Sequence, residues 1–211
     1  MNLSQFDSLI ASRSLLKHPF YQKWSKGELT LNDMQVYAKE YFHLVERIPG
    51  IVARVRDRAQ DRRLKDQIDE NVREEQEHVE LWKRFAKSVG VTEQELRSYV
   101  PSMTVQKAVA SLEETAERSF SEGVVAVYAL ELELPKIAET KKDGLCRFYG
   151  LENEDAQIYF DEHLKEEKHL GVWRAMPIEG STLKQAAERS LTAQNQVLDG
   201  VCEKCGISMV C

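Results

Sequence analysis

The chain has 211 residues, 42% of them hydrophobic and 30% charged, which is enough apolar material for one domain with a well-formed core. Its 29 basic and 35 acidic residues give a formal net charge of −6, so the composition does not indicate a nucleic-acid-binding protein. Four cysteines in such a chain do not indicate a disulfide scaffold, and they favour the reducing cytoplasm as its compartment.

The sequence indicates neither a secretory signal nor a membrane anchor. Its N-terminal stretch carries Asp7 and several polar residues, which a signal peptide would not. The longest apolar run, residues 124–130, is too short to cross a bilayer. We therefore expect a soluble cytoplasmic protein that binds neither membrane nor nucleic acid.

Helical periodicity dominates the chain, and the alternation typical of strands is nearly absent. Pro49 and Gly50 predict a break in the second long helix, because proline removes a backbone donor and clashes with the preceding turn. Thr92 and Glu95 have the spacing of a capping box and predict the start of a short helix. The sequence therefore predicts an all-α bundle. The expected helices, in chain order, are 3–17, 30–48, 50–59, 62–88, 93–99, 104–120, 122–142, 153–175 and 181–203.

The C-terminal residues carry three of the four cysteines, Cys202, Cys205 and Cys211. A pair spaced C-x-x-C can bind zinc or serve redox chemistry, but without a fourth ligand nearby these residues make only part of a usual zinc site. We expect one domain over residues 1–200 and a flexible, reducible tail over 201–211.

The expected helix 122–142 combines burial with charge. It is apolar around most of its circumference for two turns, which is typical of a helix buried on several sides. Glu131 and Glu133 interrupt it and point in different directions, so we expect one of them to face inward. An inward carboxylate needs a buried arginine or lysine, hydrogen-bond donors or a metal ion.

Three of the five histidines follow a glutamate by three residues. Residues three apart share a helix face, so each pair can offer a metal ion two ligands from one turn. Histidine with carboxylate, without paired cysteines nearby, favours iron or manganese over structural zinc. A solvated acidic face with an incidental histidine is the competing explanation. The pairs are Glu40 with His43, Glu75 with His78, and Glu166 with His169.

Two arrangements of a dinuclear site are open from spacing alone. In a ferritin-like order, each half of a bundle gives a glutamate and then a Glu-x-x-His pair, which here selects Glu40, Glu75, His78, Glu131, Glu166 and His169. The second arrangement replaces Glu40 by His163. In that case His163, Glu166 and His169 form a slanting row on one helix.

Five stretches carry a resemblance to a known family: HPFYQKWSKGEL at 18–29, LNDMQVYAKEYFHLVERIPG at 31–50, NVREEQEHVELWKRFA at 71–86, EGVVAVYALELELPKIA at 122–138 and YFDEHLKEEKH at 159–169. With these stretches in the family's order and at about its spacing, the chain from residue 4 to 199 resembles the CADD family of the haem-oxygenase-like dimetal oxidase superfamily. The resemblance implies a seven-helix haem-oxygenase-like bundle, a homodimer, and two bound metal ions without haem.

The resemblance also implies a set of metal ligands. The family's motifs fall on Glu75, His78, Glu131, His163, Glu166 and His169. Two features depart from the family: the first Glu and His lie only one turn apart, and the last motif is one residue shorter with glutamate in place of aspartate. Keeping both histidines of that motif selects Glu166, whereas an ungapped comparison selects Glu167. We favour Glu166.

The chemistry that the resemblance implies is the synthesis of p-aminobenzoate for folate. In the family the ring is thought to come from a tyrosine of the protein itself, with a lysine as the amine source. The matching residues are Tyr21, Tyr37 and Lys141. The expected cofactors are two metal ions, iron with iron or iron with manganese, together with O2 and an unknown external reductant. From the residues alone, the tyrosines would be half-buried core aromatics and the lysine solvated.

Three other functions compete with this one. A related dimetal oxidase could use the same ligands on an external small molecule. A ferritin-like metal-binding protein would require Glu40 as a ligand. Finally, the CADD family takes its name from association with death domains, so a role in protein interaction is a further alternative, although no residue pattern here predicts such a surface.

Overall fold

The structure is a computed structural model that describes residues 2–165 and 167–208, with only the backbone described at 167–169. Within those residues the chain forms α-helices and two short 3-10 helices, without a strand. The elements are η1 (Leu3–Phe6), α1 (Asp7–Ser12), η2 (Leu15–Lys17), α2 (Pro19–Trp24), α3 (Leu31–Val45), α4 (Ile48–Arg58), α5 (Arg62–Ser88), α6 (Glu93–Ser98), α7 (Met103–Arg118), α8 (Phe120–Glu131), α9 (Leu134–Tyr149), α10 (Glu154–His163), α11 (Glu167–Ala175) and α12 (Leu183–Cys205). The all-α prediction is confirmed.

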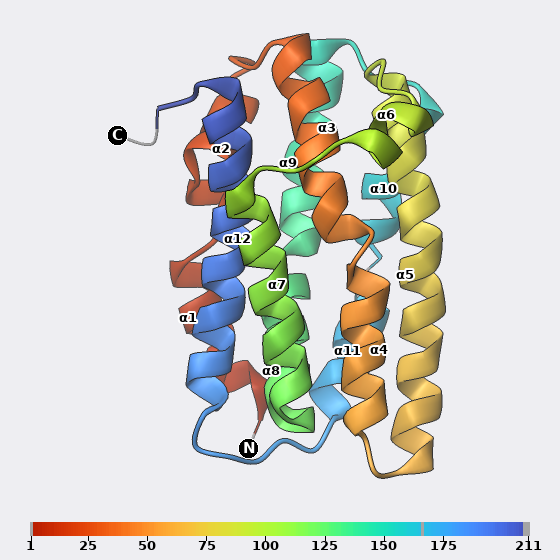
Figure 1. Ribbon diagram of the computed structural model, residues 1–211, viewed down its shortest axis with the longest axis vertical. Coiled ribbons are helices and arrows are strands. Elements are labelled where there is room, and N and C mark those ends of the chain that lie inside the picture. The colour runs from red at the N-terminus through yellow and green to blue at the C-terminus, as the bar shows by residue number, and fades with distance from the viewer. Residues whose placement is uncertain (1, 166, 209–211) are drawn as a thin grey trace.

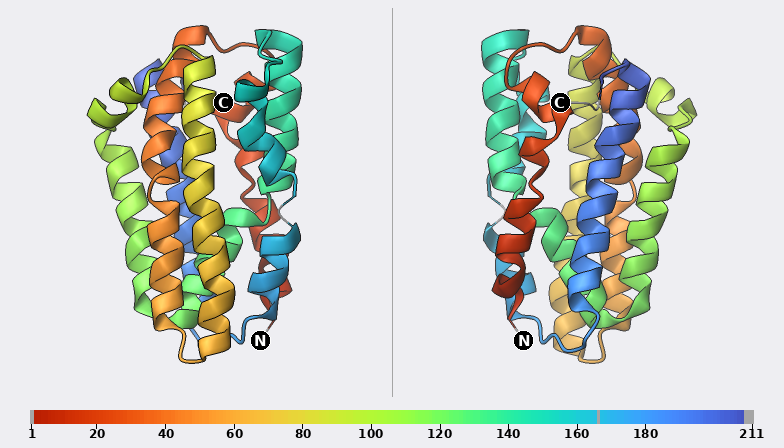
Figure 2. Two further views of the ribbon diagram at one scale, coloured as in Figure 1. Left: turned by 90° about the vertical axis from the view of Figure 1, so that its right-hand side faces the viewer. Right: turned by 90° about the vertical axis from the view of Figure 1, so that its left-hand side faces the viewer.

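The longest helices run side by side along the long axis of the molecule (Figure 1). Helix α12 packs against α7, α8 and α3, and α5 packs against α4 and α10. In the side views, α9, α10 and α11 lie with α1 and α2 on one side of α3, α4 and α5, whereas α7 lies on the other (Figure 2). None of the described helices is both long and apolar enough to cross a membrane.

The break predicted at Pro49 is present. Helix α3 ends at Val45, and α4 begins at Ile48 with Pro49 in its first turn, where a missing backbone donor costs nothing. The capping box of Thr92 and Glu95 also forms as predicted, with the side chain of each bonded to the other's backbone N–H.

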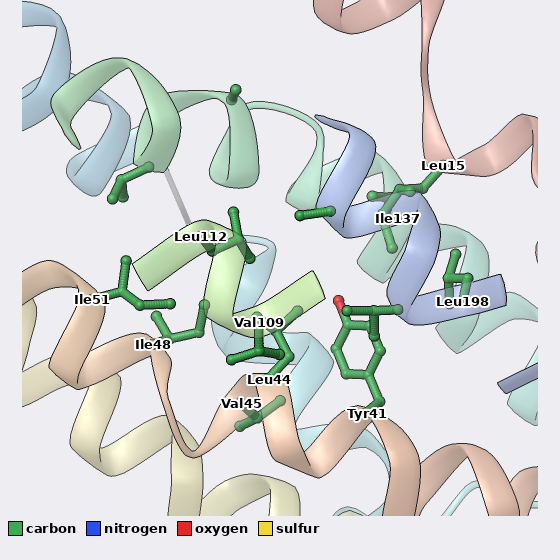
Figure 3. Packing of buried hydrophobic residues seen from close by; sticks show 14 of the residues in the cluster. Leu15, Tyr41, Leu44, Val45, Ile48, Ile51, Val109, Leu112, Ile137 and Leu198 are labelled. Carbon is green, nitrogen blue, oxygen red and sulfur yellow. The ribbon is translucent and has the colours of Figure 1, made fainter. Parts of the chain in front are cut away.

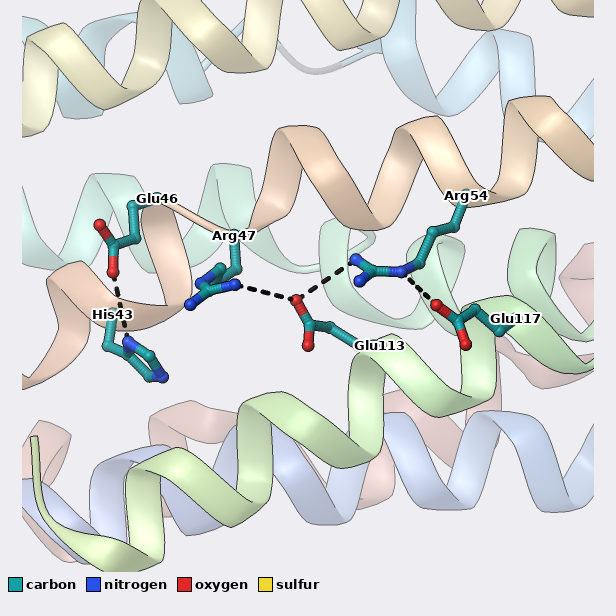
Figure 4. A network of polar contacts seen from close by, with 6 residues as sticks. All are labelled: His43, Glu46, Arg47, Arg54, Glu113 and Glu117. Atoms are coloured by element: carbon teal, nitrogen blue, oxygen red, sulfur yellow. Dashed lines mark hydrogen bonds and ion pairs between the residues drawn. The ribbon is translucent and has the colours of Figure 1, made fainter.

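Ion pairs on the outside of the bundle join α4 to α7 (Figure 4). Glu113 lies 3.7 Å from Arg47 and 3.3 Å from Arg54, and Arg54 also bonds Glu117 at 2.5 Å. Because these groups are partly exposed, we expect each pair to add at most about 1 kcal/mol to stability.

Three ranges that were predicted as continuous helices are interrupted in the structure. The range 3–17 is divided into η1, α1 and η2, and α2 was not predicted at all. The range 122–142 is interrupted after Glu131, because Pro135 occupies the first turn of a new helix, α9. The range 153–175 is interrupted after His163. The single continuous helix expected to carry His163, Glu166 and His169 is therefore wrong, and Glu166 and the His169 side chain lie outside the described residues.

An apolar cluster fills the space between these helices (Figure 3). Tyr41 and Leu44 of α3, Val109 and Leu112 of α7, and Leu198 of α12 are all buried in it. Nearly complete removal of these side chains from water is the main source of stability in a helical bundle, at about 25 cal/mol for each Å² of apolar surface buried. The same packing fixes α3, which carries several candidate site residues.

Helix α9 packs closely on α2 through a glycine. The indole N–H of the fully buried Trp24 donates a hydrogen bond to the Lys141 carbonyl at 3.2 Å. A Cβ atom added at Gly144 would lie 2.5 Å from Trp24 Nε1, closer than real Cβ atoms come. Gly144 therefore allows α9 to bring Lys141 beside α2.

Gly144→Ala is expected to lower the free energy of unfolding by about 1–3 kcal/mol, the usual cost of overpacking a core. Urea denaturation followed by circular dichroism measures this change. Gly171→Ala is the matched control, because nothing lies within 4 Å of its added Cβ. Alanine is the better helix former, so the control should be neutral or slightly stabilising. An unchanged midpoint for Gly144→Ala would contradict the close packing.

Candidate active site

A small cavity of about 30 Å³ lies among α3, α5, α8 and α10. Glu75 from α5, Glu131 from α8 and His163 from α10 line it, and each of these residues is less than a tenth exposed. The rings of Tyr41 and Tyr159 form part of its wall. A cavity needs about 10–15 Å³ of such space to hold one water molecule, so this one is large enough for a water molecule. The fold therefore brings three of the predicted metal ligands to one buried space.

His78 joins this group through its contacts. Its Nδ1 lies 3.2 Å from Glu75 Oε2, and its ring centroid is 4.5 Å from that of His163. Nδ1 of His163 lies 2.7 Å from the Tyr159 carbonyl, which can only accept a hydrogen bond. The neutral His163 ring therefore carries its proton on Nδ1 and its lone pair on Nε2, as metal-binding histidines commonly do.

Glu131 is the inward-facing carboxylate that the sequence predicted in this region. It is 2% exposed, and its Oε2 accepts a hydrogen bond from the Trp173 indole N–H at 2.7 Å. Glu133, two residues later, is also buried, at 9% exposed, and its carboxylate lies 3.9 Å from the Lys136 amine, so the structure buries both carboxylates where the sequence predicted one. Trp173 on α11 thus fixes the orientation of the Glu131 carboxylate, as a hydrogen-bonding neighbour of a metal ligand would.

Part of the predicted ligand set lies outside the described residues. Glu166 is not described, nor are the side chains of Glu167 and His169. Across residues 2–165 and 170–208, no three His, Cys, Asp or Glu side chains already lie at metal-ligand spacing. The six-residue ligand set therefore stays a prediction.

The pair Glu40 and His43 has a different environment. The Glu40 carboxylate is fully buried and accepts hydrogen bonds from the Tyr99 hydroxyl at 2.6 Å and from the Ser102 backbone N–H and hydroxyl at 3.0 and 2.9 Å. His43 lies 3.3 Å from Glu46 at the end of α3 (Figure 4). Glu40 therefore fastens the segment between α6 and α7 to α3, which gives this pair a packing role.

Tyr21, Tyr37 and Lys141 come together from α2, α3 and α9. Both tyrosines are 0% exposed and the lysine is 3% exposed, so the expectation from residue type alone, a solvated lysine and half-buried tyrosines, was wrong. Lys141 Nζ donates a hydrogen bond to the Tyr37 hydroxyl and lies 5.2 Å from the centre of the Tyr21 ring. The structure thus places the predicted amine beside both predicted rings.

Burial controls the ionisation of this cluster. It lowers the pKa of the Lys141 amine well below its usual range, because the charged form loses its hydration. Burial likewise raises the pKa values of Tyr21 and Tyr37 well above the usual tyrosine value, with neighbouring tyrosines adding to the effect. The pocket therefore favours a neutral amine beside two neutral phenols.

Aromatic side chains join the tyrosine–lysine cluster to the cavity. Tyr41 lines the cavity, and its ring centre lies 5.0 Å from Lys141 Nζ. Trp82 lies 5.5 Å from the Tyr37 ring and 4.8 Å from the ring of Tyr159, which also lines the cavity.

Sequence reasoning did not identify these three linking residues. A signal was present for two of them: Tyr41 follows Tyr37 by four residues, and Tyr159 precedes His163 by four, so each pair lies on one helix face.

Comparison with known proteins supports both the fold and the family. The TENA/THI-4/PQQC family model matches residues 8–204. A protein of Chlamydia trachomatis named 4-aminobenzoate synthase is 34% identical over 201 residues, which cover 92% of this chain and 86% of that protein.

Two crystal structures show the fold. One is a domain of unknown function with a haem oxygenase-like fold from Shewanella denitrificans, which superposes with a TM-score of 0.84 at 17% identity and covers 98% of this chain and 94% of that one. The other is a CADD-like protein of unknown function from Nostoc punctiforme, with a TM-score of 0.76 at 20% identity, covering 97% and 96% of the two chains. The haem-oxygenase-like fold predicted from the sequence is thus confirmed, and the chain belongs to the TENA/THI-4/PQQC family, as a CADD-like member.

Proposed function

We propose that this protein synthesises 4-aminobenzoate, taking the aromatic ring from its own Tyr21 or Tyr37 in a metal- and O2-dependent oxidation. The observation that carries the proposal is the burial of both tyrosines with Lys141 in one pocket. The product is an aromatic ring that bears an amine, and the pocket holds a phenol ring and an amine in contact. The name of the Chlamydia trachomatis relative gives independent support.

The cavity residues suit an iron or manganese centre. Glu75, Glu131 and His163 offer carboxylate and imidazole donors, and none of the described residues lining the cavity is a cysteine. Such donors favour these metals over structural zinc. In the proposal Glu75, His78, Glu131, His163, Glu166 and His169 hold two ions, and those ions supply the electrons that activate O2.

The protein's own part in this chemistry is to orient the ligand side chains and to keep the reacting side chains buried. Trp173 orients Glu131, and the Tyr159 carbonyl sets the tautomer of His163. Tyr41 lies between the cavity and the Tyr37–Lys141 pair, and Trp82 with Tyr159 forms a second connection of two rings. A buried amine with a lowered pKa is available as a nucleophile or a base, whereas a solvated ammonium is not.

The cavity volume also bears on the alternative of an external substrate. A space of about 30 Å³ is far below the roughly 300–1,000 Å³ of ordinary small-molecule sites. An external fatty acid or amino acid would require the site to open, whereas Tyr21 and Tyr37 are already inside.

Metal binding tests the ligand assignment. After loading with Fe(II) and Mn(II) and removal of free metal, elemental analysis should find metal bound to the parent protein and lost from His163→Ala. Glu40→Gln should retain it, because Glu40 is engaged by Tyr99 and Ser102. Trp173→Phe, which removes the hydrogen bond to Glu131, should weaken metal binding about 10–100-fold. Metal lost from Glu40→Gln but kept by His163→Ala would support the ferritin-like arrangement instead.

A further inference from the structure

We propose that Trp24 and Tyr149 form an electron route between the buried Tyr37 and the protein surface. The inference rests on the proposed function, because an O2-dependent oxidation of this kind needs electrons from an external donor. It goes beyond that function by assigning the path that the electrons follow. Neither residue lines the candidate metal cavity.

The three rings form a short, continuous series. The Tyr37 and Trp24 ring centroids are 5.7 Å apart with an interplanar angle of 70°, and those of Trp24 and Tyr149 are 5.7 Å apart at 67°. Tyr37 and Trp24 are 0% exposed, whereas Tyr149 is half-buried and follows Phe148, which is 42% exposed. Tyrosine and tryptophan can each lose and regain an electron under biological conditions, which phenylalanine cannot. Two steps between such rings therefore connect the core to the surface.

Hydrogen bonds hold the rings of this series in place. The Trp24 indole N–H donates to the Lys141 carbonyl at 3.2 Å, and the Tyr149 hydroxyl donates to the Trp24 carbonyl at 3.3 Å. The Leu29 backbone N–H donates in turn to the Tyr149 hydroxyl at 3.4 Å. Gly144 leaves space for the indole, since any larger residue there would displace it. Fixed rings in contact are what electron transfer between side chains requires.

Lys141 completes the proton balance at the buried end. When the oxidant takes one electron from Tyr37, the phenolic O–H bond breaks, and the lone pair of the neutral Lys141 amine, which lies within hydrogen-bond reach, takes the proton to form an ammonium. In the proposed function the oxidant derives from O2 at the candidate metal site.

An electron from Trp24 then restores Tyr37, which regains its proton from Lys141. Trp24 keeps its indole proton as it passes the electron on. Tyr149 supplies the electron to Trp24 and releases its own proton to water. It then regains an electron from a one-electron donor of the flavin or iron–sulfur class and a proton from water. In sum, one donor molecule loses one electron and all three side chains return to their starting state, so the route applies with Tyr21 as the consumed residue.

The route can be tested on metal-free protein, so the result does not depend on product synthesis. Cys146 is exposed on α9 and lies three residues before Tyr149. A ruthenium polypyridyl photosensitiser is attached there in a background with Cys205→Ser and Cys211→Ser, Cys202 being buried. Flash oxidation in the presence of a quencher is then followed by transient absorption and by electron paramagnetic resonance.

We expect a long-lived tyrosyl radical that disappears in Tyr37→Phe, which assigns the signal. Its yield should fall in Trp24→Phe and in Tyr149→Phe, while Tyr128→Phe, a buried tyrosine on α8 away from the route, should leave it unchanged. Tyr149→Phe alters only a half-buried residue, so it keeps the test decisive if Trp24→Phe folds poorly. A Tyr37 radical formed at the parent's yield in either folded variant would overturn the route. That outcome would leave the proposed function intact, because that function is tested separately by product formation.

Discussion

Lys141→Met is expected to stabilise the fold while abolishing 4-aminobenzoate formation. The amine lies 3% exposed among aromatic rings, where desolvation penalises its charged form. Apolar replacement of a buried ion pair is often neutral or stabilising by about 1–4 kcal/mol, and we expect the same direction for this single buried amine, because methionine is of similar size and packs well against aromatic rings. Urea denaturation at pH 7 measures the stability. Chromatography with mass detection, after incubation with Fe(II), Mn(II), reductant and O2, measures the product.

The stability difference should depend on pH in a defined direction. In the unfolded chain Lys141 has a pKa near 10.4, whereas burial lowers its pKa in the folded state. Between these two values the unfolded state binds more protons, so the parent gains stability as the pH rises. The methionine variant lacks this contribution. Its advantage should therefore shrink between pH 7 and pH 9, by at most about 1.4 kcal/mol for each pH unit.

Lys142→Met provides the matched control. Lys142 is the next residue on α9, but it is partly exposed and pairs with Asp161. Its replacement should change stability by less than about 1 kcal/mol and leave product formation intact. A normal product yield from Lys141→Met would rule out the lysine as amine source. A loss of stability would show that the hydrogen bond to Tyr37 outweighs the desolvation of the amine.

Features of the fold that depend on residues close together in the sequence could be predicted. The range 62–88 was predicted as one helix and is α5, Arg62–Ser88, because apolar periodicity and the Asp61 cap are both local signals. The break before Pro135 was missed, since the apolar pattern of 122–142 continues through it and the proline alone marks the interruption. Here Pro135 was a correct signal for a helix break, but the prediction followed the hydrophobic pattern instead.

The tyrosine–lysine cluster could not be derived from residue types. Tyr37 and Lys141 lie 104 residues apart, and lysine is almost never fully buried unless it is paired. Only the family resemblance singled them out, and only the fold brings them into contact. By contrast, Glu75 and His78 were visible as a pair, because three residues on one helix fix their proximity. Their contact with His163 again required the tertiary structure.

Either Tyr21→Phe or Tyr37→Phe is expected to abolish 4-aminobenzoate formation, whichever replaces the consumed tyrosine. That tyrosine supplies the ring of the product, and phenylalanine lacks its hydroxyl. Each variant keeps the ring that fills the core, so the protein should still fold. The two substitutions differ in their effect on stability. The Tyr21 hydroxyl is buried without a hydrogen-bond partner of standard geometry among the described residues, although the Tyr37 hydroxyl lies near it. Removal of the Tyr21 hydroxyl in Tyr21→Phe should therefore leave the stability of the fold nearly unchanged or raise it slightly.

Tyr37→Phe removes the partner of Lys141 and should cost about 1–3 kcal/mol of stability, because the buried amine is then left unsatisfied. Tyr128→Phe is the control for loss of a tyrosine hydroxyl elsewhere, since that hydroxyl bonds Asp7 at 2.7 Å. It should lose some stability and retain product formation. Stability and product yield therefore respond independently across the three variants, which separates a chemical role from a packing role.

Peptide mapping of the reacted parent protein identifies the consumed residue directly. Trypsin should release residues 18–23, which contain Tyr21 as their only tyrosine, and residues 27–39, which contain only Tyr37. One of these peptides should lose the mass of its tyrosine side chain in proportion to the product formed, with at most one product molecule for each chain. If both peptides stay intact, both phenylalanine variants keep the parent's yield and each chain makes several product molecules, the ring must come from an external substrate. The cavity of about 30 Å³ would then have to open during turnover.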